Sequence, residues 1–175
     1  MFKSVILATD GSGHAKRAAA VAVDIAATFK ARLTLVTVLS RSMTLEDIEA
    51  APQSRHLPPD AKKLMRRIYN ALRETRTVDA DVRQYVPAMP LLQESLGALI
   101  LDEAEVMAKR KKVTQVARVV DHGDAAVQIL KQSRKAKADL IVMGTRGLSS
   151  FRGLLIGSVS NKVIHDSKCA VLTVK

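Results

Sequence analysis

The sequence predicts an α/β protein built on a doubly wound parallel sheet. Short apolar segments rich in Val, Ile and Leu alternate along the chain with amphipathic helical segments, which is the pattern of such sheets. The chain has 175 residues, 47% of them hydrophobic, which is enough for one domain with a real core. Glycine-rich turns follow two of the apolar segments, as expected where strands end and helices begin.

The first strand is expected at 4–8, where five consecutive residues are apolar or small. It ends at the turn Thr9-Asp10-Gly11-Ser12, and Ser12 is a candidate cap for the helix that follows. Apolar residues then recur at helical spacing up to residue 29, and 32–39 reads as the second strand. A strand, a helix and a strand in this order predict parallel strands with a right-handed crossover.

The middle of the chain departs from this alternation. Residues 51–59 are loop-like, a helix with a strongly basic face is expected from 59, and another helix ends in the basic run 109–112. Cations in a last helical turn suit the helix dipole, which explains that run without any function. We therefore expect a single domain, 1–175, that carries a long helical insertion at about 40–112.

The remaining strands are expected at 113–120, 140–143 and 170–174. Asp124 can cap the helix between the third and fourth strands, and Ser158 the helix between the fourth and fifth. The sheet therefore has five strands.

Composition limits the function. The net charge of +11 can indicate nucleic acid or an anionic membrane, but aromatic residues are only 3%, so stacking platforms for single strands are lacking. The basic residues are also spread over 59–76, 109–112 and 131–137, and we expect neither a nucleic-acid nor a membrane partner. With the single cysteine Cys169 and no apolar run near the ~20 residues that span a bilayer, a cytoplasmic protein is expected.

One loop carries the strongest signal. Gly144 and Gly147 follow the fourth strand, and nine residues later Gly157-Ser158 opens the last helix. The order strand, glycine loop, helix offers backbone N–H groups and a positive helix end to an anion. The spacing fits neither the Walker A nor the Rossmann pattern, and a tight turn with a packing glycine is the alternative explanation.

The spacing Gly-x2-Gly-x9-Gly-Ser resembles the nucleotide-binding loop of the universal stress protein family, in its ATP-binding subgroup. The segments 6–12 and 139–147 resemble the family's first strand and its signature, whereas Ala170 stands where the family usually has Pro. The resemblance implies a strand order of 3-2-1-4-5 with helices on both faces, an adenine nucleotide alpha-hydrolase-like fold. It places Asp10 and Gly144 on opposite sides of one crevice.

The same resemblance implies a bound ATP, or ADP or AMP, with Mg²⁺ or Mn²⁺. Asp10 is then expected near the ribose or triphosphate, directly or through the metal; Val38 at the adenine edge; Met143 near the sugar; and Arg146 at a phosphate. The complete set expected to bind the nucleotide is Ala8, Thr9, Asp10, Val38, Met143, Gly144, Arg146, Gly147, Gly157, Ser158, Val159 and Ser160. The alternatives are a turn carboxylate for Asp10 and plain core roles for Val38 and Met143.

No catalytic set accompanies this loop, since Asp10 is its only obvious acid and His14 and His122 have no assigned geometry. We expect a nucleotide-dependent stress-response switch or binding module with at most slow ATP hydrolysis. The alternatives are an enzyme of adenylyl or phosphoryl transfer, and a basic stress protein that binds nucleic acid or a partner through the helix at 59–76. A homodimer through the strand at 170–174 and an unidentified protein partner complete the expectation.

Overall fold

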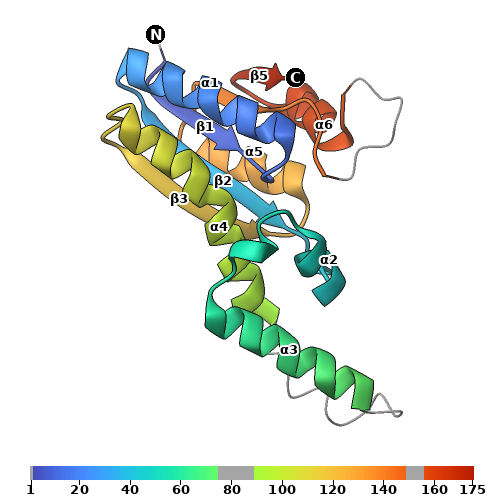
Figure 1. The fold of residues 1–175 in the computed structure, drawn as a ribbon. Helices are drawn as coiled ribbons and strands as arrows, with labels where there is room; N and C mark the ends of the chain where they lie inside the picture. Colours follow the sequence, from blue (N-terminus) through green and yellow to red (C-terminus); the bar gives the residue numbers. More distant parts are fainter. Residues whose placement is uncertain (1, 75–88, 149–155) are drawn as a thin grey trace. The chain divides into compact units, whose positions relative to one another are not determined.

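A computed structural model describes residues 2–74, 89–148 and 156–175, without the side chains of 71–74. Its sheet has five parallel strands, in the order β3-β2-β1-β4-β5, which confirms the predicted fold class and strand order (Figure 1). The strands are β1 (Ser4–Ala8), β2 (Arg32–Leu39), β3 (Val116–His122), β4 (Leu140–Gly144) and β5 (Ala170–Val174).

Helices cover both faces of this sheet. On one face, α1 (Gly13–Phe29) and the second half of α4 (Met89–Arg110) share an apolar cluster with β1, β2 and β4. On the other face, α5 (Ala125–Lys135) and α6 (Ser158–Asp166) pack against the opposite side of the same strands. Alanines dominate the buried side of α1, and small side chains let this helix lie close to the sheet.

The predicted helix starts hold at two of three places. Ser12 accepts a hydrogen bond from the N–H of Ala15, and Asp124 accepts one from Val127, so both are N-caps. Ser158 is not a cap: it is the first residue of α6, and Gly157 occupies the cap position without a side chain. The third strand begins at Val116 rather than at Val113, because the N–H of Val113 still bonds back to Ala108 at the end of α4.

The chain separates into two compact units, one made of Met1–Arg41 with Ile100–Lys175 and the other of Ser42–Leu99. The first contains the whole sheet. The second contains α2 (Leu45–Ala50), a 3-10 turn at Ser54–His56, α3 (Pro59–Glu74) and the beginning of α4. It overlaps the insertion expected at 40–112, and the single domain remains a prediction.

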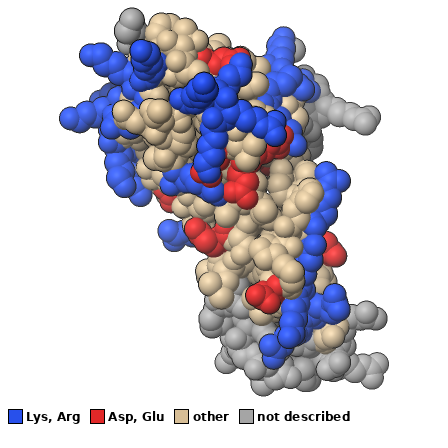
Figure 2. Space-filling view, turned by 60° about the vertical axis from the view of Figure 1, so that its left-hand side comes forward, with Lys and Arg blue, Asp and Glu red and all other residues tan. Residues whose placement is uncertain are grey.

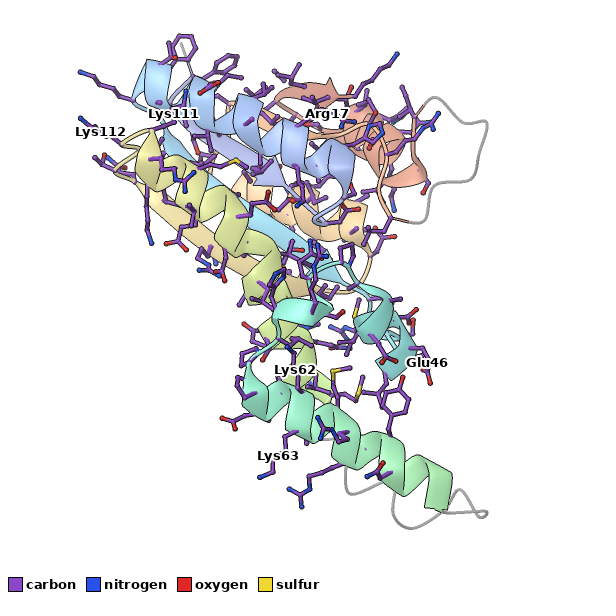
Figure 3. The ribbon with its side chains drawn as sticks, in the orientation of Figure 1. Arg17, Glu46, Lys62, Lys63, Lys111 and Lys112 are labelled. Atoms are coloured by element: carbon purple, nitrogen blue, oxygen red, sulfur yellow. The ribbon has the colours of Figure 1, made fainter. Side chains whose placement is uncertain are left out.

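Within the second unit, α3 is strongly amphipathic. Ala61, Met65 and Ile68 are buried, while Lys62 and Lys63 are exposed (Figure 3). The predicted basic helix is therefore present, and its apolar face is covered. Pro90 lies in the first turn of α4, where a missing N–H costs nothing.

No helix in the described parts of the chain combines the length and the apolar character that a bilayer crossing requires.

Candidate functional site

Two loops meet at the carboxyl ends of β1 and β4, in the middle of the sheet. The two strands pair up to Ala8 and Met143, and from there one loop leads into α1 and the other toward α6. The chain leaves these neighbouring strands on opposite sides of the sheet, since α1 and α6 cover different faces. A ligand crevice in an open α/β sheet forms at such a switch point.

Asp10 ties the two loops together. Its Oδ1 accepts the N–H of Ser12 at 3.0 Å, within its own turn, and its Oδ2 accepts the N–H of Leu148 at 3.0 Å, from the loop after β4. The first bond stabilises the turn after β1, which is the alternative role considered above for Asp10. The second bond crosses between the loops and directs Asp10 at the glycine loop.

A side chain at either of two glycines of this loop would meet a neighbouring group. A Cβ at Gly144 would lie 2.9 Å from the Cβ of His14 and 3.0 Å from the backbone nitrogen of Ala15, at the start of α1. A Cβ at Gly147 would lie 2.5 Å from Oδ2 of Asp10. Gly144 therefore lets β4 end against α1, and Gly147 leaves room for the Asp10 carboxylate.

Gly157 differs from them. Its φ is −72° and its ψ is 158°, an extended conformation that any residue adopts. A Cβ there would make ordinary van der Waals contacts, with the carbonyl oxygen of Thr145 at 3.4 Å and with Cα of Arg146 at 3.6 Å. Neither packing nor backbone conformation requires a glycine at this position. The tight-turn explanation therefore does not account for Gly157.

The N-terminus of α6 presents open hydrogen-bond donors. The N–H of Gly157 donates to Thr145 at 2.7 Å, and the first intrahelical bond runs from Asn161 to Gly157. The N–H groups of Ser158, Val159 and Ser160 lie between them and have no acceptor among the described residues. Because no side chain caps the helix, these donors and the positive end of the helix dipole are available to an anion.

The hydroxyl of Ser160 is already used. It is buried and donates to the carbonyl oxygen of Gly144 at 2.9 Å, so it fastens the start of α6 to the end of β4. The hydroxyl predicted for a ligand at this position thus has a structural partner. Ser158 is exposed, and its hydroxyl is the one at this helix start that faces solvent.

Backbone groups of β2 flank the end of β1 on the side away from β4. In a parallel ladder the N–H and C=O of one residue point to the same neighbour, and successive residues alternate. Val36 bonds toward the β1 side, where its carbonyl accepts the N–H of Thr9, and Leu39 bonds toward β3 through Gly123. The N–H and C=O of Val38 therefore point toward the β1 side, beyond the last pair, Ala8 with Val36. A donor and an acceptor side by side suit the edge of a purine.

The other side chains predicted to bind the nucleotide are buried or half-buried. The side chains of Met143 and Ala8 are buried in the core under α5 and α6, as their alternative role required. Thr9 is also buried, and its Oγ1 accepts the N–H of Gly11. Arg146 is half-buried in the glycine loop and has no ion-pair partner among the described residues.

One contact of the site escaped sequence reasoning. Nδ1 of His14 lies 2.9 Å from Oγ1 of Thr145, so a second side-chain pair joins the loop after β1 to the loop after β4. The spacing of residues 14 and 145 in the sequence does not predict this pair. The only signal is that both residues follow strands that prove to be neighbours.

The site fits a nucleotide better than a metal held by protein alone. Within the described residues no three His, Cys, Asp or Glu side chains gather to hold an ion, and Asp10 is the acid of these loops. Mg²⁺ in nucleotide sites is bound by one or two carboxylates together with substrate phosphates. Asp10 could contribute one such oxygen, whereas the backbone donors of α6 fit the phosphates themselves.

Comparisons with known proteins agree with this architecture. A universal stress protein from Thermus aquaticus is 34% identical over 178 residues and covers 100% of both chains. The stress response protein NhaX of Bacillus subtilis is 27% identical and covers 98% of this chain and 96% of its own. Among solved structures, a universal stress protein in complex with cAMP superposes with a TM-score of 0.61 at 26% identity, covering 99% and 97% of the two chains. UspA from Lactobacillus plantarum, at 18% identity and a TM-score of 0.58, shares the fold.

The family resemblance that the glycine spacing suggested is thereby tested over the whole chain. The model of the Universal stress protein family matches residues 1–175, and the sheet order and the glycine loop agree with that match. The chain belongs to the universal stress protein family.

Proposed function

We propose that the protein binds ATP in the crevice at the carboxyl ends of β1 and β4 and serves as a nucleotide-dependent switch or binding module in the stress response. The open N-terminus of α6 carries this proposal. Three N–H groups, from Ser158 to Ser160, have no acceptor within the described parts of the chain and lie where the glycine loop ends, as a phosphate site requires.

The adenine is assigned to the backbone of Val38. A ligand that reaches from Val38 on β2 to α6 must cross the ends of β1 and β4. Asp10 follows the end of β1, and Gly144 is the last residue of β4. A nucleotide with a ribose in the middle has this order of groups. The complex of a 26% identical universal stress protein with cAMP supports an adenine nucleotide as the ligand class.

The switch role rests on the bonds between the two loops. Asp10 with Leu148 and His14 with Thr145 join the loop after β1 to the loop after β4, so a ligand that orders one loop acts on the other. Among the described residues of these loops, Asp10 is the one acid, and both of its carboxylate oxygens already accept backbone N–H groups. Hydrolysis is therefore expected to be slow, and binding is the function.

The test is to identify the ligand and measure its effect on stability. Mass spectrometry of the small molecules released from freshly purified protein should detect an adenine nucleotide. For ATP with a Kd in the low micromolar range, about −8 kcal/mol, a hundredfold excess should stabilise the fold by ~2.7 kcal/mol. For a chain of this size that is a rise in Tm of roughly 5–11 °C. If neither ATP, ADP, AMP nor cAMP raises the Tm at millimolar concentration with Mg²⁺, the proposal fails.

We further propose a homodimer through β5. This strand is at one edge of the sheet, and Leu172 at its centre is 37% exposed. An apolar edge strand with free backbone groups favours pairing with a second strand. Light scattering at micromolar concentration should give twice the mass of the chain, and Leu172→Lys should shift it toward the monomer. A monomeric mass for the unmodified protein would exclude this dimer.

A further inference from the structure

Most of the basic segments of the first unit lie at the end of the sheet where the strands begin, opposite the carboxyl ends of β1 and β4. In a parallel sheet the amino ends of all strands meet at one edge. Residue 3 precedes β1, residues 30 and 31 precede β2 and residue 32 begins it, 109–112 precede β3, 134–137 precede β4, and residue 168 precedes β5. Four basic residues fill 109–112, three lie in 134–137, two in 30–32, and Lys3 and Lys168 complete the set. We call these segments the amino edge.

Backbone hydrogen bonds hold these segments next to one another. The N–H of Arg32 donates to the carbonyl of Lys3, and the N–H of Asp139 donates to that of Ser4. Figure 2 brings this side of the first unit toward the viewer, and Lys and Arg cover more of it than Asp and Glu. Lys111 and Lys112 project where α4 ends (Figure 3).

Few acids neutralise this charge. Lys111 pairs with Asp24 at 2.9 Å, and Lys109 pairs with Glu105 at 2.7 Å. The carboxylate of Asp139 accepts the backbone N–H groups of Lys3 and Ser4 instead of a cation, and Asp166, at the end of α6, pairs with His165. The remaining basic side chains of the amino edge are exposed and have no ion-pair partner in the described parts of the chain.

Three of these lysines are held in an unfavourable backbone conformation. Lys30, Lys112 and Lys137 have φ values of 52°, 58° and 48°, and they are the positive-φ residues other than glycine in the described chain. Each follows the end of a helix, α1, α4 and α5 respectively, where glycine is the usual residue. A cation at a helix end suits the dipole, but a lysine in the last turn would do that without the left-handed conformation. Strained residues that recur at one surface point to function.

We propose that the amino edge docks the phosphate backbone of double-stranded nucleic acid, without reading its sequence. Strands lie about 4.8 Å apart, so the five strand ends span roughly 19 Å. A duplex carries one negative charge per ~1.7 Å of axis with both strands counted, so a length equal to this row carries about eleven phosphates, of which one face of the duplex presents a part. Clustered Lys and Arg on one face of a strongly basic domain are the electrostatic sign of nucleic-acid binding.

This inference revises the expectation that nucleic acid is no partner. That expectation relied partly on the spread of basic residues along the sequence, but the fold brings 109–112 and 134–137 together with Lys3, Lys30 and Arg32. The shortage of aromatic residues argues against stacking on single strands and leaves binding to a duplex backbone unaffected.

A membrane surface is the less favoured occupant. Phe29, the residue before 30–32, is a large apolar side chain beside these segments with 36% exposure, and its ring packs edge-on against Phe2 with centroids 5.6 Å apart. An interfacial anchor needs apolar side chains that can enter the lipid, and this edge offers charge without such an anchor.

The test uses a variant that removes charge without straining the fold. Lys30→Gly, Lys112→Gly and Lys137→Gly, combined, place glycine at three left-handed positions, so the Tm should stay equal or rise. Fluorescence anisotropy with two unrelated labelled DNA duplexes should give similar affinities for both in the wild type, falling steeply between about 50 and 200 mM salt. The triple variant should bind at least tenfold more weakly at low salt. Its slope of log K against log salt should be smaller by about 2.7, from ~0.9 per lost contact.

The matched control removes three charges from another basic surface. Lys62→Gln, Lys63→Gln and Arg66→Gln, combined, lie on the exposed face of α3 and should change the affinity less than threefold. An equal loss in both variants, selectivity for one duplex, or the absence of duplex binding at low salt would overturn the proposal. So would binding to phosphatidylserine vesicles in place of the duplex. ATP-induced stabilisation of the triple variant should match the wild type, because the amino edge lies away from the carboxyl-end crevice.

Discussion

The strands of this sheet end at one side, which we call the carboxyl edge, and begin at the other, the amino edge. These two sides have opposite chemistry. At the carboxyl edge, glycines leave space, Asp10 crosses between two loops, and α6 begins with open N–H groups. At the amino edge, the helices end, and lysines take the left-handed positions that glycine usually fills. The difference shows that the chain uses glycine where a backbone must come close to another group and lysine where the surface is open. The proposed nucleotide site and the proposed duplex-binding face rest on these two choices.

The largest loss of stability is expected at Gly144, where the carboxyl edge is tightly packed. Gly144→Ala would place a Cβ within 3.0 Å of the backbone at the start of α1, which must then shift. We expect a loss of about 3 kcal/mol of stability, a fall in Tm of roughly 6–12 °C, because overpacking a tight contact costs this much. Thermal unfolding followed by circular dichroism measures it. A fall of less than ~2 °C would show that β4 does not end against α1 as described.

Gly157 tests the same edge in the other direction. Gly157→Val fits the local φ of −72° and should cost about 1 kcal/mol or less, since valine is a poorer helix cap than glycine. Its branched side chain would nevertheless stand beside the N–H groups of α6, and we expect ATP affinity to fall at least tenfold, about 1.4 kcal/mol. Calorimetric titration and thermal unfolding of the same protein separate the two effects. Normal affinity in the folded variant would remove Gly157 from the site.

The hydroxyl of Ser160 ties α6 to the sheet and is expected to matter moderately. Ser160→Ala leaves the carbonyl of Gly144 without this donor in a buried place, which should cost about 1 kcal/mol. Ser158→Ala, with its exposed side chain, is the matched control and should change stability by less than ~0.5 kcal/mol. Equal Tm values for the two variants would argue against the bond between Ser160 and Gly144.

The smallest expected effect is at the amino edge, where the contribution of Asp139 to stability depends on pH. The backbone N–H groups of Lys3 and Ser4 hold the pKa of Asp139 below its ordinary value of 3.8. A depressed folded pKa stabilises the protein above the ordinary pKa, and this stabilisation is lost as pH falls below about 4. Asp139→Asn should therefore lower the Tm slightly at pH 7, and the difference from the wild type should shrink at pH 3. A difference that stays constant from pH 7 to pH 3 would contradict this role.

Sequence reasoning predicted the sheet well because each of its signals is local. The apolar segments, the caps Ser12 and Asp124 and the glycine spacing can all be read from neighbours in the chain. It missed the bonds of Asp10 with Leu148 and of His14 with Thr145, because each joins residues more than a hundred positions apart. It also treated three basic segments as dispersed, since only the strand order reveals that two of them share an edge. The roles of the twelve predicted site residues remain predictions that ligand binding must test.

The central claim is that the carboxyl-edge loops bind ATP, and Gly147 tests it most directly. A Cβ at this position would displace the Asp10 carboxylate from the N–H of Leu148, whereas a Cβ at Gly13 would meet only the guanidinium of Arg17, at 3.9 Å. Isothermal titration of ATP with Mg²⁺ into the wild type and Gly13→Ala should give the same low-micromolar Kd, about −8 kcal/mol. Gly147→Ala should bind at least tenfold more weakly while its Tm falls by no more than about 4 °C. ATP binding by Gly147→Ala that equals the wild type, or no binding by the wild type, would contradict the account.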